Sequence, residues 1–206
     1  MTKLPRQFYN AFTLIELIVT IGILAIILTI VVVAINPAEQ LSRSRDSKRI
    51  SDLGAMRTAW NLYLAQASTT VDLSGNASYT CKGEGGSNVG YFVSRSVSTT
   101  TPSGFNYTVT NTSQVIGVNG WAPARIDQTP GGSTISNLPV DPKGPNTSEE
   151  FWYAYACDQT AKSFEFTARF ESNYFLTDLD NDGRDGGNST TTYEVGTDLA
   201  LIPGSY

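Results

Sequence analysis

Hydrophobic positions divide the chain into one unbroken apolar run and a longer polar remainder. The run extends from Phe12 to Ile35 and contains one charged residue, Glu16. As a helix rising about 1.5 Å per residue, it is long enough to cross a hydrocarbon core of ~30 Å. It is too long for the apolar part of a secretory signal peptide, and the polar sequence after it is not a small-residue cleavage site. A plain membrane anchor explains everything except Glu16, because a carboxylate in apolar surroundings is costly and requires a partner.

Helical character continues beyond this run. Pro37 removes a backbone donor and clashes with the preceding turn, which predicts a kink or local melting of the helix near residues 34–36. A stripe of apolar residues then recurs at helical spacing and is suited to pack under a sheet. Its members are Leu41, Ile50, Leu53, Met56, Trp60, Leu64 and Ala67.

Charged residues are concentrated on this second stretch of helix. They are Arg43, Arg45, Lys48 and Arg49, with Asp46 and Asp52 among them. The expected role is a solvated helix face. The alternatives are pairing between subunits and contact with lipid head groups.

The composition changes at Ala67 to stretches rich in Ser, Thr and Gly, which predict loops. Between them, strands are predicted at 89–96, 105–110, 113–118, 151–157 and 163–170, and a hairpin connection at 158–162. The clearest strand alternates Phe164, Phe166 and Ala168 with Ser163, Glu165 and Thr167. The fold class is therefore α+β, with a long N-terminal α-helix, membrane-spanning in its first half, packed against a C-terminal antiparallel β-sheet head.

Composition excludes several functions. There is no histidine, which removes Ser-His-Asp and Cys-His catalysis and the histidine zinc motifs. The two cysteines are too far apart for a thiolate zinc site. A net charge of −5 argues against a nucleic-acid footprint over the whole surface and leaves a local basic patch as the alternative. We therefore expect neither an enzyme nor a direct nucleic-acid partner.

The segment before the apolar run is short and basic, with Lys3, Arg6 and no acid, and AFTLIEL follows at once. This arrangement resembles the prepilins of type IV pili and type II secretion pseudopili. The resemblance implies that a prepilin peptidase cuts between Ala11 and Phe12 and methylates the new amino terminus. The family usually has Gly before the cut, so Ala11 implies slower processing. The expected regions are a leader (1–11), a transmembrane and filament-core helix (12–36), its amphipathic continuation (37–67) and a pilin-like β head (68–206).

The resemblance also gives Glu16 a role. It is the acid that the family places four residues after the cut, where it would pair with the Phe12 amine of a neighbouring subunit. Such a pair offsets the cost of two buried charges, and only one stagger of the subunits brings them together. The function implied is a structural subunit of a type IV pilus or pseudopilus. The alternative is a membrane-anchored extracytoplasmic binding domain that does not polymerise.

The partners and location follow from the same resemblance. The partners would be copies of this chain and other pilins, the prepilin peptidase and a membrane assembly platform. The chain would cross the cytoplasmic membrane once with its head extracytoplasmic, and then enter a cell-surface or periplasmic filament.

A weaker similarity lies before the last predicted hairpin. Asp141, Pro142 and Gly144 match a turn that precedes the sheet in pilins and pseudopilins. Lys143 stands where the family often has tryptophan, so this match leaves the subclass open.

Cys81 and Cys157 both follow the membrane segment and so would face the oxidising side. An even count of two predicts a disulfide, with two buried thiols as the alternative. A loop of this length would contribute about 4 kcal/mol in the chain-entropy model.

An acidic loop lies near the C-terminus, at TDLDNDGRDGGNS. Asp178, Asp180, Asp182 and Asp185 resemble the start of an EF-hand loop, but Ser189 stands where the bidentate Glu belongs. The loop also resembles the calcium-binding loop of major pseudopilins. Calcium is therefore the expected ligand, and a solvated acidic turn is the alternative.

Overall fold

The structure is a computed structural model that describes residues 12–66, 71–75, 78–85, 87–97, 99–144 and 151–204. The leader with Ala11, the residue before the expected cut, lies outside the described residues, and so does Ala67. The chain divides into two compact units, residues up to Gln40 and residues from Leu41 onward, and each is described by itself.

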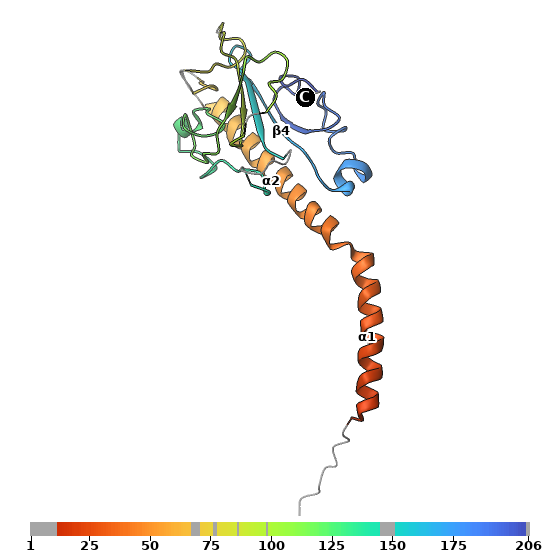
Figure 1. Ribbon diagram of the computed structural model, residues 1–206. Coiled ribbons are helices and arrows are strands. Elements are labelled where there is room, and N and C mark those ends of the chain that lie inside the picture. Colours follow the sequence, from red (N-terminus) through yellow and green to blue (C-terminus); the bar gives the residue numbers. More distant parts are fainter. Residues whose placement is uncertain are drawn as a thin grey trace, which may run out of the picture. The chain divides into compact units, whose positions relative to one another are not determined.

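The first unit is dominated by helix α1, Leu14–Ile35 (Figure 1). No residue of α1 is buried within the chain, although almost all of them are apolar. The hydroxyls of Thr20 and Thr29 donate to the carbonyls of Leu17 and Ala25, both at 2.8 Å. The helix thus satisfies these polar groups internally and presents an apolar surface on every side, as a lipid-facing helix does.

The helix is interrupted next to Pro37. Helix α1 ends at Ile35, Asn36 takes a left-handed conformation with φ 46°, and helix α2 (Pro37–Gln66) begins at the proline. Proline fits the first position of a helix because its missing N–H needs no partner there. The side-chain oxygen of Asn36 accepts the N–H of Glu39 at 3.5 Å. The sequence NPAE therefore ends one helix and starts the next.

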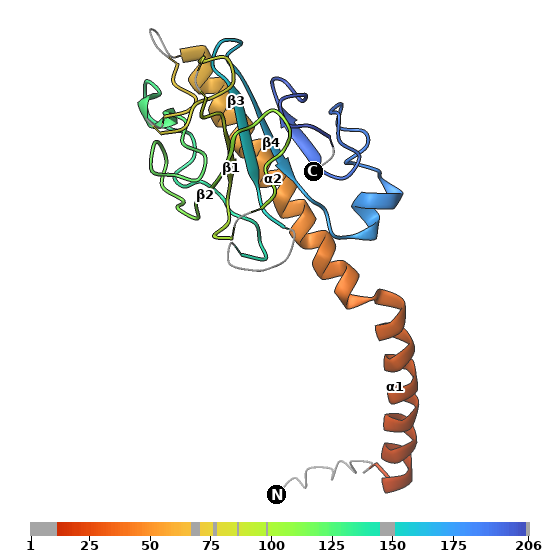
Figure 2. The same ribbon diagram turned by 45° about the horizontal axis from the view of Figure 1, so that its top comes forward.

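The second unit contains a five-stranded sheet in the order β2-β1-β3-β4-β5. Its strands are β1 (Gly90–Val93), β2 (Tyr107–Thr110), β3 (Ala154–Asp158), β4 (Ser163–Ala168) and β5 (Tyr193–Gly196). Two short helices, a 3-10 turn at Ile126–Gln128 and a π-helix at Tyr174–Asp178, lie in the connections. Figure 2 shows the strands beside α2, and the predicted α+β arrangement is confirmed.

Three details of the sheet differ from the prediction. Strand β2 runs parallel to β1, while the other pairings are antiparallel. Parallel pairing is possible because the long connection from Val93 to Tyr107 lets the chain return in the same direction. The predicted strand at 113–118 is irregular, and Gly117 takes φ +90° there, which breaks an extended backbone. Strand β5 was not predicted.

The main core lies between α2 and one face of the sheet. Trp60 of α2 packs edge-on against Phe166 of β4 and Tyr155 of β3, with ring centroids 4.9 and 5.7 Å apart. Phe164 belongs to the same cluster, as the alternation in β4 predicted. The hairpin between β3 and β4 is also confirmed, with Lys162 in a left-handed turn position.

The two cysteines form a disulfide, as predicted, with an S–S distance of 1.98 Å. Cys157 lies on β3 and Cys81 precedes β1, and both are buried in the main core. The bond joins residues separated by 76 positions, so it fixes the loop-rich segment before β3 to the middle of the sheet.

Candidate functional site in the N-terminal helix

The start of α1 is a capping box made by Thr13 and Glu16. The Thr13 hydroxyl accepts the N–H of Glu16 at 3.2 Å. In return, the Glu16 Oε2 atom accepts the Thr13 N–H and hydroxyl, both at 3.4 Å. The sequence T-x-x-E at a helix start explains this geometry, because it satisfies two backbone donors that have no partner within the helix.

This capping uses only one oxygen of the Glu16 carboxylate as a hydrogen-bond acceptor. Only its Oε2 atom accepts hydrogen bonds from another described residue. Among the described residues, no lysine or arginine lies within ion-pair distance of this carboxylate. The carboxylate lies one turn from Phe12, whose side chain is exposed. A carboxylate with an open oxygen on an apolar helix can accept a charged hydrogen bond from another molecule, and an ammonium group is the natural donor.

The comparisons with known proteins agree with this geometry. Residues 7–32 match the family described as the prokaryotic N-terminal methylation motif, which is the prepilin motif of type IV pilins and pseudopilins. The match covers the expected cut, Phe12, Glu16 and most of α1. No curated protein and no solved structure matches the chain. One helix of the described residues is long and apolar enough to cross a membrane.

The charged residues of α2 are arranged differently from the expected solvated face. Arg49 is fully buried, with 0% of its side chain exposed, and Asp46 and Asp52 are buried as well. Leu41, which the predicted stripe includes, is exposed. The buried face of α2 thus begins with paired charges and becomes apolar from Leu53 onward.

Arg49 is the centre of an ion-pair network that joins α2 to two distant segments. Its Nε and Nη2 atoms donate to both carboxylate oxygens of Asp141, at 2.6 and 2.9 Å. Its Nη1 atom donates to Asp46 at 2.6 Å and to Glu171 at 2.9 Å. Asp46 also accepts the N–H and hydroxyl of Ser172. The turn at Asp141 and the chain after β4 are therefore both fixed to one helix.

The network also controls the ionisation of Glu171. Burial alone would raise the pKa of Glu171, but hydrogen bonds from Arg45, Lys143 and Arg49 lower it to about 2. The basic residues at 45, 48 and 49 thus have acidic partners within the same compact unit. This intramolecular pairing explains them without lipid head groups or neighbouring subunits.

The carboxyl groups of the acidic loop are less closely clustered than its sequence suggests. Asp180, at φ +51°, pairs with Arg184 at 3.1 Å. Asp185 accepts the backbone N–H groups of Gly187 and Glu194, so two of the four acids already have partners within the loop and β5. Among the described residues, no group of three or more acidic or cysteine side chains is placed to hold a metal ion. The calcium prediction therefore rests on the sequence alone.

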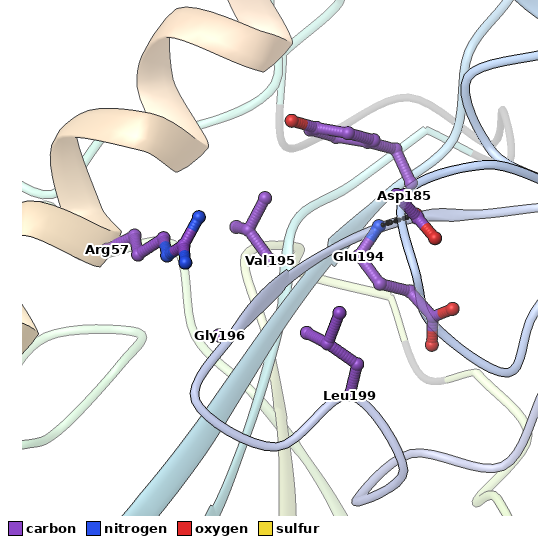
Figure 3. Close-up of a pocket in the computed structure, with 7 residues that line it drawn as sticks. Arg57, Asp185, Glu194, Val195, Gly196 and Leu199 are labelled. Carbon is purple, nitrogen blue, oxygen red and sulfur yellow. Dashed lines mark hydrogen bonds between the residues drawn. The ribbon is translucent and has the colours of Figure 1, made fainter.

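A small cavity of about 160 Å³ lies beside β5 (Figure 3). Arg57 of α2, Asp185, Val195 and Leu199 line it. The Glu194 side chain leaves the strand on the side away from Arg57 and Val195. The cavity is smaller than the range of about 300–1,000 Å³ typical of small-molecule sites, so it does not define a ligand pocket.

Sequence reasoning missed the burial of several charged residues, among them Arg49 and Glu165. Arg49 lies at a helical spacing of three or four from Asp46 and Leu53, and that spacing could have placed it on the buried face. Glu165 gave no such signal, because it alternates with phenylalanines in the way that a solvent-facing residue does.

Proposed function

We propose that this chain is a structural subunit of a type IV pilus or a type II secretion pseudopilus. In this proposal a prepilin peptidase processes the chain, which then polymerises through α1. One observation carries the proposal. Glu16 is the only charged residue of an otherwise apolar helix, it lies within the matched motif, and its carboxylate has an open oxygen one turn from Phe12.

The chemistry of the two charges supports polymerisation. The amine that cleavage would create at Phe12 and the Glu16 carboxylate are each unfavourable when isolated in an apolar environment. Pairing them between neighbouring subunits offsets that cost, and removing either partner leaves a buried unpaired charge. The pair therefore favours one axial register of the helices.

The proposed function also defines the partners and the location of the chain. The prepilin peptidase and the assembly platform act at the cytoplasmic membrane, and the other pilins and copies of this chain form the filament. A head on the extracytoplasmic side agrees with the Cys81–Cys157 disulfide, because such bonds persist in oxidising compartments.

Maturation gives the most direct test. The mature protein is expected to begin at Phe12 with a methylated amine and to lose Lys3 and Arg6, which changes the formal charge from −5 to −7 (12 basic and 19 acidic residues). N-terminal mass spectrometry of membrane fractions measures this. An intact Met1, or a cut beyond Ile35, would contradict the proposal.

Polymerisation is tested separately by shearing. The protein is expected in the sheared surface or periplasmic fraction as a high-molecular-weight form. If processed protein stays monomeric in the membrane under all growth conditions, it is instead an anchored binding domain.

We propose calcium binding by the acidic loop as an independent property. Calcium that binds only the folded state stabilises it by about 2.7 kcal/mol at a hundredfold excess over Kd. The full-length protein in detergent should then melt several degrees higher in calcium than in chelator. Replacing Asp180 and Asp182 together with alanine should erase the difference. Identical melting of the unmodified protein in both buffers would identify a solvated turn.

A further inference from the structure

The sheet face turned away from α2 carries a second apolar cluster. Tyr91, Val93, Ala154 and Ala156 project from β1 and β3, and Phe105 packs with them. Leu201 and Ile202, near the C-terminus, are buried in the same cluster. We name the first five residues the back-face patch and residues 198–202 the C-terminal strap. The strap therefore covers apolar surface that would otherwise meet water.

Two carboxyl groups lie buried on this face. Glu165 of β4 is 0% exposed and Glu194 of β5 is 2% exposed. Glu165 Oε2 accepts the N–H of Ile202 at 2.8 Å, so it holds the strap directly. Glu194 Oε2 accepts the N–H of Ser189, also at 2.8 Å. Gly187 lies against this carboxyl, since a Cβ there would come within 1.9 Å of Glu194 Oε2.

The other oxygen of each carboxyl has no donor among the described residues. Glu165 pairs with Gly196 and Glu194 pairs with Thr167, so the two glutamates are diagonal neighbours on the same face of adjacent strands. Two ionised carboxylates in this position would repel one another, whereas one proton between them supplies the missing hydrogen bond. Burial raises the pKa of Glu165, and the neighbouring Glu194 raises it further. Burial also raises the pKa of Glu194.

Lys82 is a basic group that contacts the C-terminal strap. Its ammonium donates to the Leu201 carbonyl and lies 4.4 Å from the centroid of the Phe105 ring. Burial lowers the pKa of Lys82, while Glu165, Asp158 and Asp198 act to raise it. The negative charge of Asp185, in the neighbouring loop, also raises the pKa of Glu194. The strap is thus held at two successive residues, by Lys82 at Leu201 and by Glu165 at Ile202.

We propose that the C-terminal strap is a proton-dependent clasp. It stays closed while Glu165 and Glu194 share a proton, and it opens locally as the pH rises, which uncovers the back-face patch. This inference is independent of processing and polymerisation, because it concerns only the head.

The direction of the pH dependence follows from linkage. Opening exposes Glu165 to water and returns its affinity for protons to the ordinary range. The closed state therefore binds the proton more tightly, and loss of the proton favours opening. The opening equilibrium rises by up to about tenfold per pH unit between the ordinary and the raised pKa. Lys82 has the opposite effect where it titrates, so the test is confined to about pH 5 to pH 8, below the ordinary lysine range.

Amide hydrogen exchange on the full-length protein in detergent tests the clasp, with chelator present to exclude divalent cations. The protection factor of the Ile202 amide is expected to fall at least tenfold from about pH 5 to pH 8, while amides in β3 keep theirs. Glu165→Gln, whose amide can donate to Glu194 without titrating, should hold Ile202 equally protected at both pH values. Glu84→Gln, at an exposed acid that also accepts a backbone N–H, should retain the unmodified pH dependence.

Either of two results overturns the proposal. One is a protection factor of Ile202 that does not change with pH, and the other is a Glu165→Gln variant that keeps the unmodified slope. If Glu165→Gln does not fold, infrared spectroscopy of the unmodified protein decides. A protonated carboxylic acid band at about pH 7 supports the shared proton, and its absence overturns the proposal.

Discussion

Replacing Glu16 with leucine is expected to abolish filaments while membrane insertion and the head remain intact. The substitution removes a charge that is unfavourable for an isolated helix, so α1 should insert at least as well. The Phe12 amine of the next subunit would then lack its partner, and burying it unpaired costs about 3–5 kcal/mol at each subunit contact. Immunoblots of sheared and membrane fractions measure both outcomes.

Matched variants separate the charge from the capping function of Glu16. Glu16→Gln keeps an oxygen that can accept from Thr13 but has no charge, so it should fail as completely as leucine. Thr13→Val removes the capping hydroxyl and leaves the charge, and it should have a smaller effect, since a helix cap contributes about 1 kcal/mol. Thr20→Val, which loses only a bond to the Leu17 carbonyl, serves as the control. Normal filament yield from Glu16→Gln would show that the charge is not needed.

The second large effect is expected at Arg49. Arg49→Met leaves Asp46, Asp141 and Glu171 in place without their shared cation, and breaking a buried pair in this way costs about 3–5 kcal/mol. At roughly 2–4 °C per kcal/mol for a domain of this size, the melting temperature should fall by about 10 °C. Calorimetry or circular dichroism of the full-length protein in detergent measures it.

Arg57→Met is the matched control for this experiment. Arg57 lies two turns further along α2, is exposed and forms no ion pair with the described residues, so its replacement should change the melting temperature by about 1–2 °C at most. Arg49→Lys should fall between the two, because a lysine cannot form the bidentate pair with Asp141. Equal melting of Arg49→Met and Arg57→Met would show that the network does not stabilise the head.

The two buried acidic systems respond to pH in opposite directions. The pKa of Glu171 is lowered, so its contribution to stability is present above the ordinary value and is lost as the pH falls toward about 2. The pKa of Glu165 is raised, so its contribution is present at acidic pH and is lost as the pH rises. The head should therefore tolerate mild acid better than alkali.

Much of the architecture could be predicted because it depends on local patterns. The apolar run from Phe12 to Ile35 has only one low-energy solution in a membrane, a helix, and Asn36 with Pro37 contains the signals that end one helix and begin another. The alternation in β4 and the short connection after β3 specified the hairpin. The disulfide followed from two cysteines and their position beyond the membrane segment.

The remaining features depend on segments that meet only in the folded head. The parallel pairing of β1 with β2 depends on where a long connection returns, and residue patterns do not specify that path. Strand β5 has only four residues and takes its pairing from β4, so its own sequence is a weak signal.

The sequence alone determined the N-terminal segment of this protein: the membrane-length helix, the motif at its start and the single acid one turn from the expected cut. These are properties of consecutive residues and do not depend on contacts far along the chain. Only the tertiary structure decided that Arg49 is buried and that Glu165 faces Glu194 under a strap. Arg49 lies 92 positions from Asp141, and Glu165 lies 37 positions from Ile202. A charged residue is recognisable as buried only when the distant partners that make its burial favourable are known.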